Sequence, residues 1–243
     1  MAVREQVAEK PNWAGVAEPA ALRQPATLRL VPAPKLLRTE KRPGANDAAY
    51  RRAKRCLDLT AAFLLLVFSV PLLILAATAI RLESEGPVLF RQWRLGRNGQ
   101  PFRILKLRTL TVVEEGAVRQ VTRDDPRLTR VGRLLRKLSI DELPQLINVI
   151  RGEMSLVGPR PHAIAHDRYY AARIANYTQR QNVKPGITGW AQILGYRGET
   201  ATLDDMRRRV RFDLWYVRHA GFLLDLRILL ATPWAVISGR NAG

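Results

Sequence analysis

The sequence predicts an α+β fold that is mainly helical. In this fold a re-entrant membrane helix hairpin, interfacial amphipathic helices and a small β-hairpin or sheet surround one site at the cytoplasmic face. Three segments predict it: an apolar run at 59–80, strand-like segments within 88–107, and a basic amphipathic stretch at 127–138. Each has a length or a periodicity that is typical of one kind of element.

The run at 59–80 is apolar apart from two threonines, one serine and one proline. About 20 such residues cross a bilayer, and a soluble core helix rarely stays apolar on every face for this long. Basic residues lie on both sides of the run, so a straight span would leave one basic flank outside, against the positive-inside tendency. Pro71 stands near the middle and removes one backbone hydrogen bond, which is a physical cause for a bend. We therefore expect a helix that enters the membrane and returns.

The strand-like segments at 88–90 and 102–107 flank a turn at 96–101 and predict a β-hairpin. The stretch at 127–138 carries leucines and a valine on one helical stripe and arginines and a lysine on the rest. Such a helix lies in a lipid interface, binds nucleic acid, or packs on a core with a solvated face. The apolar stretch at 222–237 predicts one or two short helices against the bilayer or the membrane segment.

Composition points to anionic partners. The 243 residues include 40 Lys and Arg against 21 Asp and Glu, a formal net charge of +19. This excess suits nucleic acid, a lipid surface or phosphorylated substrates, and composition alone does not choose among them. The single cysteine, Cys56, excludes an intramolecular disulfide framework and a cysteine-based zinc site.

The chain divides into three parts by composition. Residues 1–48 are rich in alanine, proline and charge without an apolar period, which predicts a disordered or flexible N-terminal tail. Residues 49–82 form the membrane helix, and 83–243 form one domain with helices at the membrane interface.

Two adjacent acids, Asp141 and Glu142, follow Ser139 and precede Pro144. Ser139 and Glu142 have the spacing of a capping box, and a first helical turn favours negative charge. Judged by propensity alone, a purely structural role at a helix start is the better interpretation.

Three further segments change that interpretation. They read Phe-Arg-Gln-Trp-Arg-Leu-Gly at 90–96, Glu-Met-Ser-Leu-Val-Gly-Pro-Arg-Pro at 153–161 and Lys-Pro-Gly-Ile-Thr-Gly-Trp-Ala-Gln at 184–192. In this order and spacing, and with the membrane segment before them, they resemble the bacterial sugar transferase family, the monotopic phosphoglycosyl transferases. The likeness covers about residues 50–241.

The resemblance implies a two-step transfer of a hexose-1-phosphate from a UDP-sugar to polyprenyl (undecaprenyl) phosphate, the first membrane step of exopolysaccharide, O-antigen or glycan synthesis. Asp141 would attack the β-phosphate, release UMP and form a phosphosugar-aspartate, which polyprenyl phosphate then attacks. Glu142 would hold Mg²⁺. A carboxylate nucleophile and anionic phosphates repel one another, so cations are needed to bring them together.

The family's other functional positions carry over residue by residue. Lys106 and Arg108 match a basic pair, and Arg160 matches an arginine between two prolines, which suits phosphate. A lone acid in an apolar stretch, such as Asp225, costs free energy unless it binds a cation or orients an arginine. The full set expected to bind substrate or phosphate is Lys106, Arg108, Arg160, Gln192, Arg197, Asp213 and Asp225.

Two departures from the family pattern concern the bend and the substrate. Many members have a serine directly before the proline of the membrane helix, whereas here Val70 precedes Pro71 and Ser69 lies one residue further back. We expect Ser69 and Pro71 to form the bend. Where many members read Gly-Arg after the Thr-Gly-Trp-Ala-Gln stretch, this chain has Tyr196 between the glycine and Arg197.

The expected partners are a UDP-sugar, polyprenyl phosphate and the membrane lipid bilayer, with no nucleic acid, and a homodimer is compatible with them. The expected location is the inner (cytoplasmic) membrane, with the catalytic domain on the cytoplasmic face. The alternative is a noncatalytic basic protein that associates with membranes or binds nucleic acid. A zinc site at His162 and His166 lacks further ligands in the sequence.

Overall fold

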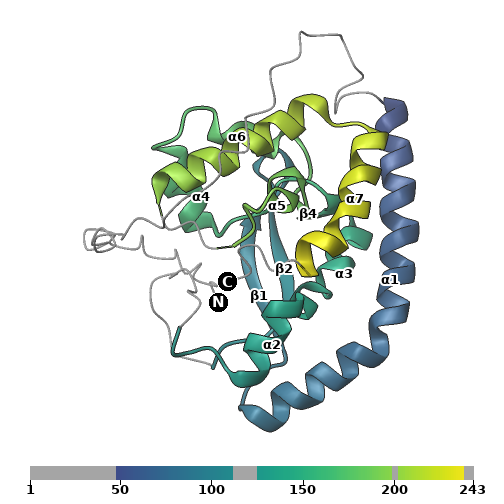
Figure 1. The fold of residues 1–243 in the computed structure, drawn as a ribbon, viewed down its shortest axis with the longest axis vertical. Coiled ribbons are helices and arrows are strands. Elements are labelled where there is room, and N and C mark those ends of the chain that lie inside the picture. The colour runs from purple at the N-terminus through teal and green to yellow at the C-terminus, as the bar shows by residue number, and fades with distance from the viewer. Residues whose placement is uncertain (1–47, 112–124, 199–201, 238–243) are drawn as a thin grey trace, which may run out of the picture. The chain divides into compact units, whose positions relative to one another are not determined.

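The computed structural model describes residues 48–111, 125–198 and 202–237 of the chain. The predicted N-terminal tail at 1–48 lies outside the described residues except for Ala48, the first residue of helix α1. Figure 1 shows the described part as a mainly helical α+β arrangement in which several helices lie around a two-stranded hairpin.

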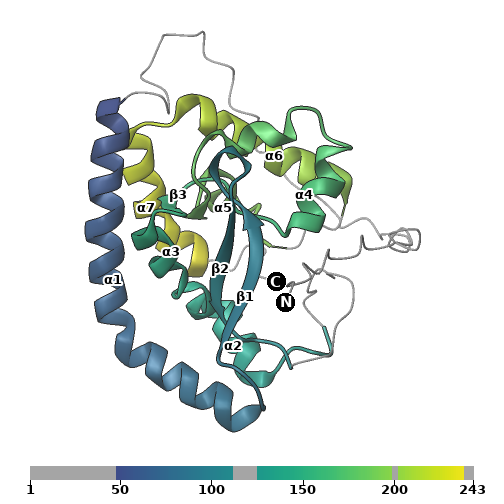
Figure 2. The same ribbon diagram turned by 180° about the vertical axis from the view of Figure 1, so that it is seen from behind.

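Helix α1 runs from Ala48 to Glu83 without interruption, with Pro71 inside it. Its most apolar window has a mean hydropathy of 2.7, and only 11% of that window is buried. Among the described helices it is the one with the length and composition to cross a membrane. It is one helix that bends along its course, and its two arms do not pack against each other (Figures 1 and 2).

Both residues predicted to form the bend lie inside α1. Because proline has no backbone N–H, Pro71 cannot donate to a carbonyl oxygen of the preceding helical turn. The Ser69 hydroxyl donates to the carbonyl of Leu66 at 3.1 Å and also contacts that of Leu65. A serine that bonds back to the preceding turn bends a helix further.

Strands β1 (Leu89–Leu95) and β2 (Pro101–Leu107) form the predicted antiparallel hairpin, with Leu89 opposite Leu107 and Leu95 opposite Pro101. The connection passes through a short 3₁₀ turn, η1 (Arg97–Gly99). Its Asn98 has a φ of 55°, a left-handed conformation that asparagine tolerates better than most residues.

Helix α2 begins three residues later than the amphipathic pattern predicts, at Arg130, and ends at Leu138. Residues 127 and 128 instead pair with residues 110 and 111 at an antiparallel bridge. There the N–H of Thr111 donates to the carbonyl of Arg127. The side chain of Thr129 caps the helix by accepting from the N–H of Gly132 at 2.8 Å.

The remaining elements are short apart from the last two helices. They are η2 (Ile140–Glu142), α3 (Gln145–Arg151), β3 (Ser155–Val157), α4 (Ile164–Ala171), η3 (Tyr177–Asn182), β4 (Gly186–Thr188), α5 (Trp190–Ile193), α6 (Leu203–His219) and α7 (Phe222–Ile237). Strands β3 and β4 are parallel. The stretch at 222–237 is therefore one helix, although Pro233 lies inside it.

The main core lies where α1 meets α3 and α7, which run beside it in Figures 1 and 2. Ala62, Val149, Met154 and Ile228 are fully buried there. A second cluster, at the far arm of α1, joins that helix to β2 and α2. The globular part thus packs against one face of α1 and leaves the other face, including Phe68 at 80% exposure, uncovered.

Candidate active site

The two acids lie in a turn whose local geometry differs from the predicted capping box. Ser139 ends α2 in a left-handed conformation, with φ 60° and ψ 21°, and its side chain caps no backbone N–H. Ser139 precedes a helical turn, as predicted, but it is also the residue that ends α2, and its N–H donates back to the carbonyl of Arg136. The predicted capping box with Glu142 is therefore wrong. Asp141 and Glu142 follow in the 3₁₀ turn η2, before α3 begins.

Two cations from distant segments converge on Glu142. The Nζ of Lys106, on β2, lies 2.8 Å from Glu142 Oε1. The guanidinium of Arg160, in the turn after β3, reaches both carboxylate oxygens at 2.6 and 3.2 Å. A forked guanidinium on a carboxylate is the strongest ordinary ion-pair geometry.

Asp141 is held more loosely than its neighbour. Its contact with Lys106 is 3.8 Å, longer than a hydrogen bond, although the acid is only 6% exposed. Lys106 therefore stands between the two carboxylates and binds one of them much more closely.

The two acids have opposite electrostatic environments. Burial raises the pKa of Asp141 more than the charge of Lys106 lowers it. Burial also acts to raise the pKa of Glu142, but the charges of Arg160 and Lys106 outweigh it and hold that pKa well below its ordinary value. Glu142 is thus a fixed anion, whereas Asp141 is a buried carboxylate of increased basicity.

Arg197 joins the same group from the segment after α5. Its Nη2 donates to the side-chain oxygen of Ser139, two residues before Asp141. Its charge also lowers the pKa of Glu142. Of the predicted residues, the structure therefore brings Asp141, Glu142, Lys106, Arg160 and Arg197 together.

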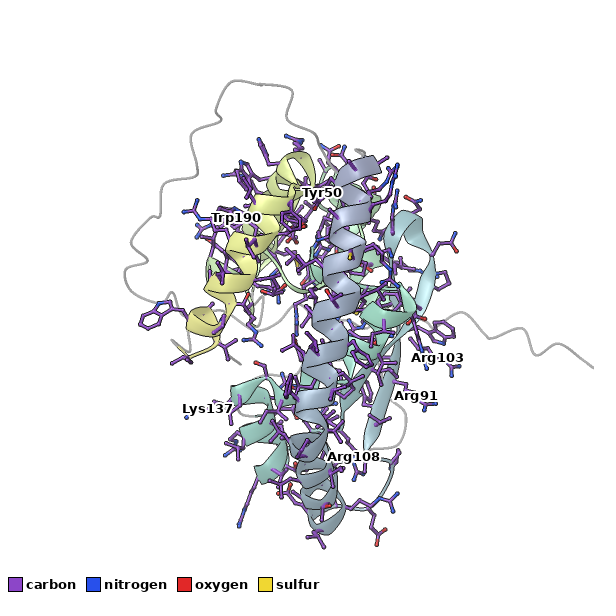
Figure 3. All side chains as sticks on the ribbon, turned by 90° about the vertical axis from the view of Figure 1, so that its right-hand side faces the viewer. Tyr50, Arg91, Arg103, Arg108, Lys137 and Trp190 are labelled. Carbon is purple, nitrogen blue, oxygen red and sulfur yellow. The ribbon has the colours of Figure 1, made fainter. Side chains whose placement is uncertain are left out.

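Arg108 and Gln192 lie in other contacts. The guanidinium of Arg108 donates to the carbonyl oxygens of Ser84, at 2.7 Å, and Glu85, just beyond the end of α1. Figure 3 shows Arg108 beside the lower arm of that helix. Gln192 Nε2 donates to the carbonyl of Ile187 at 2.9 Å.

The two predicted aspartates of the C-terminal helices are buried, and each pairs with a cation. Asp213 accepts from Arg180 Nε at 2.8 Å. Asp225 accepts from Lys54 Nζ at 2.7 Å, from Tyr50 at 2.7 Å and from Tyr216 at 2.6 Å. Figure 3 shows Tyr50 where α1 lies beside α7, so Asp225 ties these helices together.

Four residues near Arg160 are not among the site residues predicted from the sequence. Burial lowers the pKa of Arg94 and of Arg209 to about 10, and each also feels the charge of Arg160. Arg180 and His162 are buried beside them. No local pattern marks Arg180 and Arg209, since an arginine on a short helical element or a helix is usually solvent-exposed.

Within the described residues, no group of three or more His, Cys, Asp or Glu side chains is arranged to hold a metal by itself. The carboxylates of Asp141 and Glu142 nevertheless fit Mg²⁺, which is commonly bound by one or two carboxylates and completed by substrate phosphates and water. His162, one half of the zinc alternative, has its Nδ1 2.6 Å from the hydroxyl of Tyr177.

Comparison with known proteins gives a consistent result. The model of a family described as bacterial sugar transferase matches residues 49–239. A UDP-glucose:undecaprenyl-phosphate glucose-1-phosphate transferase of Caulobacter vibrioides is 55% identical over 78% of this chain and 71% of its own length. A protein of the same name from Escherichia coli K12 is 50% identical over 75% of this chain and 39% of its own. An undecaprenyl-phosphate glucose phosphotransferase of Komagataeibacter xylinus is 52% identical over 78% of this chain and 36% of its own.

Proposed function

The chain belongs to the bacterial sugar transferase family, and from this premise we propose that it transfers a hexose-1-phosphate from a UDP-sugar to undecaprenyl phosphate and releases UMP. The observation that carries the proposal is the buried pair Asp141 and Glu142 with Lys106 and Arg160 around it. Anionic phosphates require such cations beside a carboxylate nucleophile.

Asp141 is the nucleophile. One of its carboxylate oxygens attacks the β-phosphorus of the UDP-sugar, the bond from that phosphorus to the bridging oxygen breaks, and UMP leaves with the electron pair. An oxygen of undecaprenyl phosphate then attacks the phosphosugar-aspartate and expels the carboxylate, which restores Asp141. The looser contact and raised pKa of Asp141 support this role, since a more basic carboxylate is a better nucleophile once ionised.

Glu142, Lys106 and Arg160 supply the fixed charges. Because Glu142 holds both cations by short contacts, their N–H groups stay oriented toward the acidic pair. Such preorganised donors stabilise charge without rearranging during the reaction. We assign Glu142, with Asp141 beside it, to Mg²⁺, which when bound supplies charge neutralisation for the diphosphate.

The sugar is proposed to be glucose. The relatives from Caulobacter vibrioides, Escherichia coli and Komagataeibacter xylinus all carry glucose in their names. A UDP-N-acetylgalactosamine-undecaprenyl-phosphate N-acetylgalactosaminephosphotransferase of Aeromonas hydrophila is less similar, at 40% identity. The product would prime an exopolysaccharide or a related glycan.

The membrane arrangement that suits this reaction is a re-entrant one at the cytoplasmic face of the inner membrane. Support comes from the bend in α1, its uncovered apolar face and the basic residues at both of its ends. Helix α7 adds the exposed side chains of Leu230 and Trp234. These features suit a helix at a lipid interface.

UMP release from UDP-glucose by the detergent-solubilised chain, with Mg²⁺ and undecaprenyl phosphate present, tests the function. Asp141→Asn is expected to abolish turnover and the trapping of a sugar-phosphate adduct on the protein. Asp204→Asn changes an exposed acid on α6 and serves as the control with ordinary turnover. Turnover by Asp141→Asn would contradict the assignment of Asp141 as the nucleophile. If the unaltered chain releases no UMP from any UDP-sugar, the result favours the noncatalytic or nucleic-acid-binding alternative.

Removal of divalent cations tests the metal assignment. With a chelator in excess we expect UMP release to stop and to return when Mg²⁺ is added back, because Glu142 and the substrate phosphates would otherwise repel each other. Full activity in chelator would contradict the assignment of Glu142 as a metal ligand.

A further inference from the structure

The backbone of Arg160 is clamped on both sides. Arg160 stands between Pro159 and Pro161, and its own carbonyl accepts from Arg180 Nη2 at 2.8 Å. The carbonyl of Pro159 accepts from the N–H of Gly186 at 3.0 Å. The prolines restrict the φ angles of this turn, and the two hydrogen bonds tie it to neighbouring segments.

Arg180 uses its whole guanidinium in this arrangement. Its Nε donates to Asp213 at 2.8 Å and its Nη1 to the hydroxyl of Tyr177 at 3.1 Å, while Nη2 holds the carbonyl of Arg160. Arg180 is 6% exposed and Asp213 is 2% exposed. Because η3 carries the arginine and α6 carries the aspartate, the pair ties the Arg160 turn to two elements of the globular part.

A hydrogen-bonded chain of Tyr177, Asp167 and His162 lies on the other side of Arg180. The hydroxyl of Tyr177 donates to Asp167 at 2.7 Å and lies 2.6 Å from Nδ1 of His162. Since the single proton of Tyr177 goes to Asp167, we assign a proton to Nδ1 of His162, which then donates to Tyr177. Nη1 of Arg180 also lies 3.2 Å from this nitrogen, and in this tautomer it donates to Tyr177 and not to His162. Burial, together with the charge of Arg180, holds the pKa of His162 well below its ordinary value, so the imidazole is neutral.

We infer that Arg180 and Asp213 are positioning residues for the transfer reaction. They hold the carbonyl of Arg160 and thereby aim its guanidinium at Glu142 and at the phosphate beside it. The inference rests on the proposed function, and it gives Asp213 a different role from the substrate contact that the family resemblance implied. A displacement of about 1 Å at a positioning group is enough to reduce a rate about a hundredfold.

A double-mutant cycle on Arg180 and Arg160 tests this role. Arg180→Lys keeps the positive charge beside Asp213 but loses the planar fork that reaches three partners. We expect it to lower kcat about tenfold to a hundredfold with little change in KM, because Arg180 does not touch substrate. In an Arg160→Lys background, Arg180→Lys is expected to cause no further loss, since its effect passes through Arg160.

The matched control is Arg207→Lys, which changes an exposed arginine of α6 that also pairs with an aspartate, Asp204, at 2.8 Å. It is expected to leave kcat unchanged. Wild-type activity in Arg180→Lys, or losses that multiply in the double variant, would overturn the inference. If Arg180→Lys does not fold by circular dichroism, Tyr177→Phe replaces it, because it removes one acceptor of Arg180 and leaves the ion pair. Its smaller loss must likewise vanish in the Arg160→Lys background, and a loss that persists there refutes the role.

A measurement without substrate separates this inference from the proposed function. The side-chain Nε–H resonance of Arg160, assigned by its disappearance in Arg160→Lys, is compared by NMR between wild type and Arg180→Lys. We expect the resonance to shift in Arg180→Lys and not in Arg207→Lys. An unchanged resonance refutes positioning, whereas a shift in a chain that releases no UMP supports positioning and refutes the transferase proposal.

Discussion

At the scale of single residues, two adjacent acids differ because their neighbours differ. Glu142 has short contacts to Lys106 and Arg160, whereas Asp141 has one long contact to Lys106. Their pKa values therefore move in opposite directions from the ordinary range. Environments that separate the pKa values of two neighbouring acids are how enzymes give them separate roles.

A buried neutral histidine makes stability depend on pH. The pKa of His162 is lowered well below 6.5 in the folded chain by burial and by the charge of Arg180. Above pH 6.5 His162 is neutral in both the folded and the unfolded chain, and its contribution to the free energy of unfolding is fully present. As the pH falls from 6.5 toward the folded pKa, only the unfolded chain binds the proton, so this contribution is lost. The loss is about 1.4 kcal/mol per pH unit for one proton. We expect the unfolding temperature to fall with pH in this window.

The matched variant is His162→Asn, whose amide N–H takes the place of the Nδ1 donor to Tyr177 and does not titrate. Its unfolding temperature is expected to fall less steeply with pH than that of the wild type. Equal slopes in the two proteins would assign the pH dependence to other groups.

At the scale of elements, α1 is attached to the globular part near both of its ends. Near its start, Lys54 and Tyr50 bind Asp225 of α7. At its end, Arg108 binds the carbonyls that follow the helix, and the Glu83 carboxylate accepts from the N–H of Arg130 at 2.7 Å, at the start of α2. Because α2 leads directly into the turn of the two acids, the C-terminal arm of α1 is connected to the candidate site through one helix.

Removal of the Asp225 charge tests the attachment at the start of α1. Asp225→Asn leaves Lys54 beside a neutral group in a buried site, which typically costs about 3–5 kcal/mol. Denaturant unfolding in detergent is expected to show a loss of this order. Asp204→Asn, at an exposed pair, is expected to change stability by less than about 0.5 kcal/mol. A similar small change in both variants would show that the Asp225 contacts do not stabilise the fold.

At the scale of the whole molecule, α1 has one face packed against the globular part and a second, apolar face that is exposed. The globular part covers one side of the helix, and residues such as Phe63, Leu64 and Phe68 remain exposed on the other. A bilayer is the solvent that suits this face, since an apolar patch of this size is rare on a soluble monomer.

Cysteine labelling tests the re-entrant arrangement in sealed vesicles. Cys56→Ser removes the single native thiol, and Arg51→Cys or Glu85→Cys then places one exposed thiol before or after the membrane segment. A membrane-impermeant maleimide is expected to label both positions from the same side. Labelling from opposite sides would establish a helix that spans the membrane.

Features that depend on residues close together in the chain were predictable. The length of the apolar run, Pro71 within it and the hairpin around 96–101 required no knowledge of the rest of the molecule, and the structure contains all three. The prediction that Asp141 and Glu142 belong to the active site came from the order of the motifs, and the structure places both acids beside Lys106. The capping box failed because the same local pattern at Ser139 suits a helix end as well as a helix start.

Features that depend on distant partners were not predictable from local patterns. Lys106 meets Glu142 across 36 residues, and Arg180 meets Asp213 across 33. A charged residue in the sequence carries no mark of whether it will be exposed or buried beside a partner, because the fold sets both its burial and its neighbours. The chain's own pattern therefore identifies the long apolar helix, the hairpin and the acidic pair. The packing of β2 against η2 determines that Lys106 holds Glu142, and the packing of η3 against α6 determines that Arg180 and Asp213 hold Arg160.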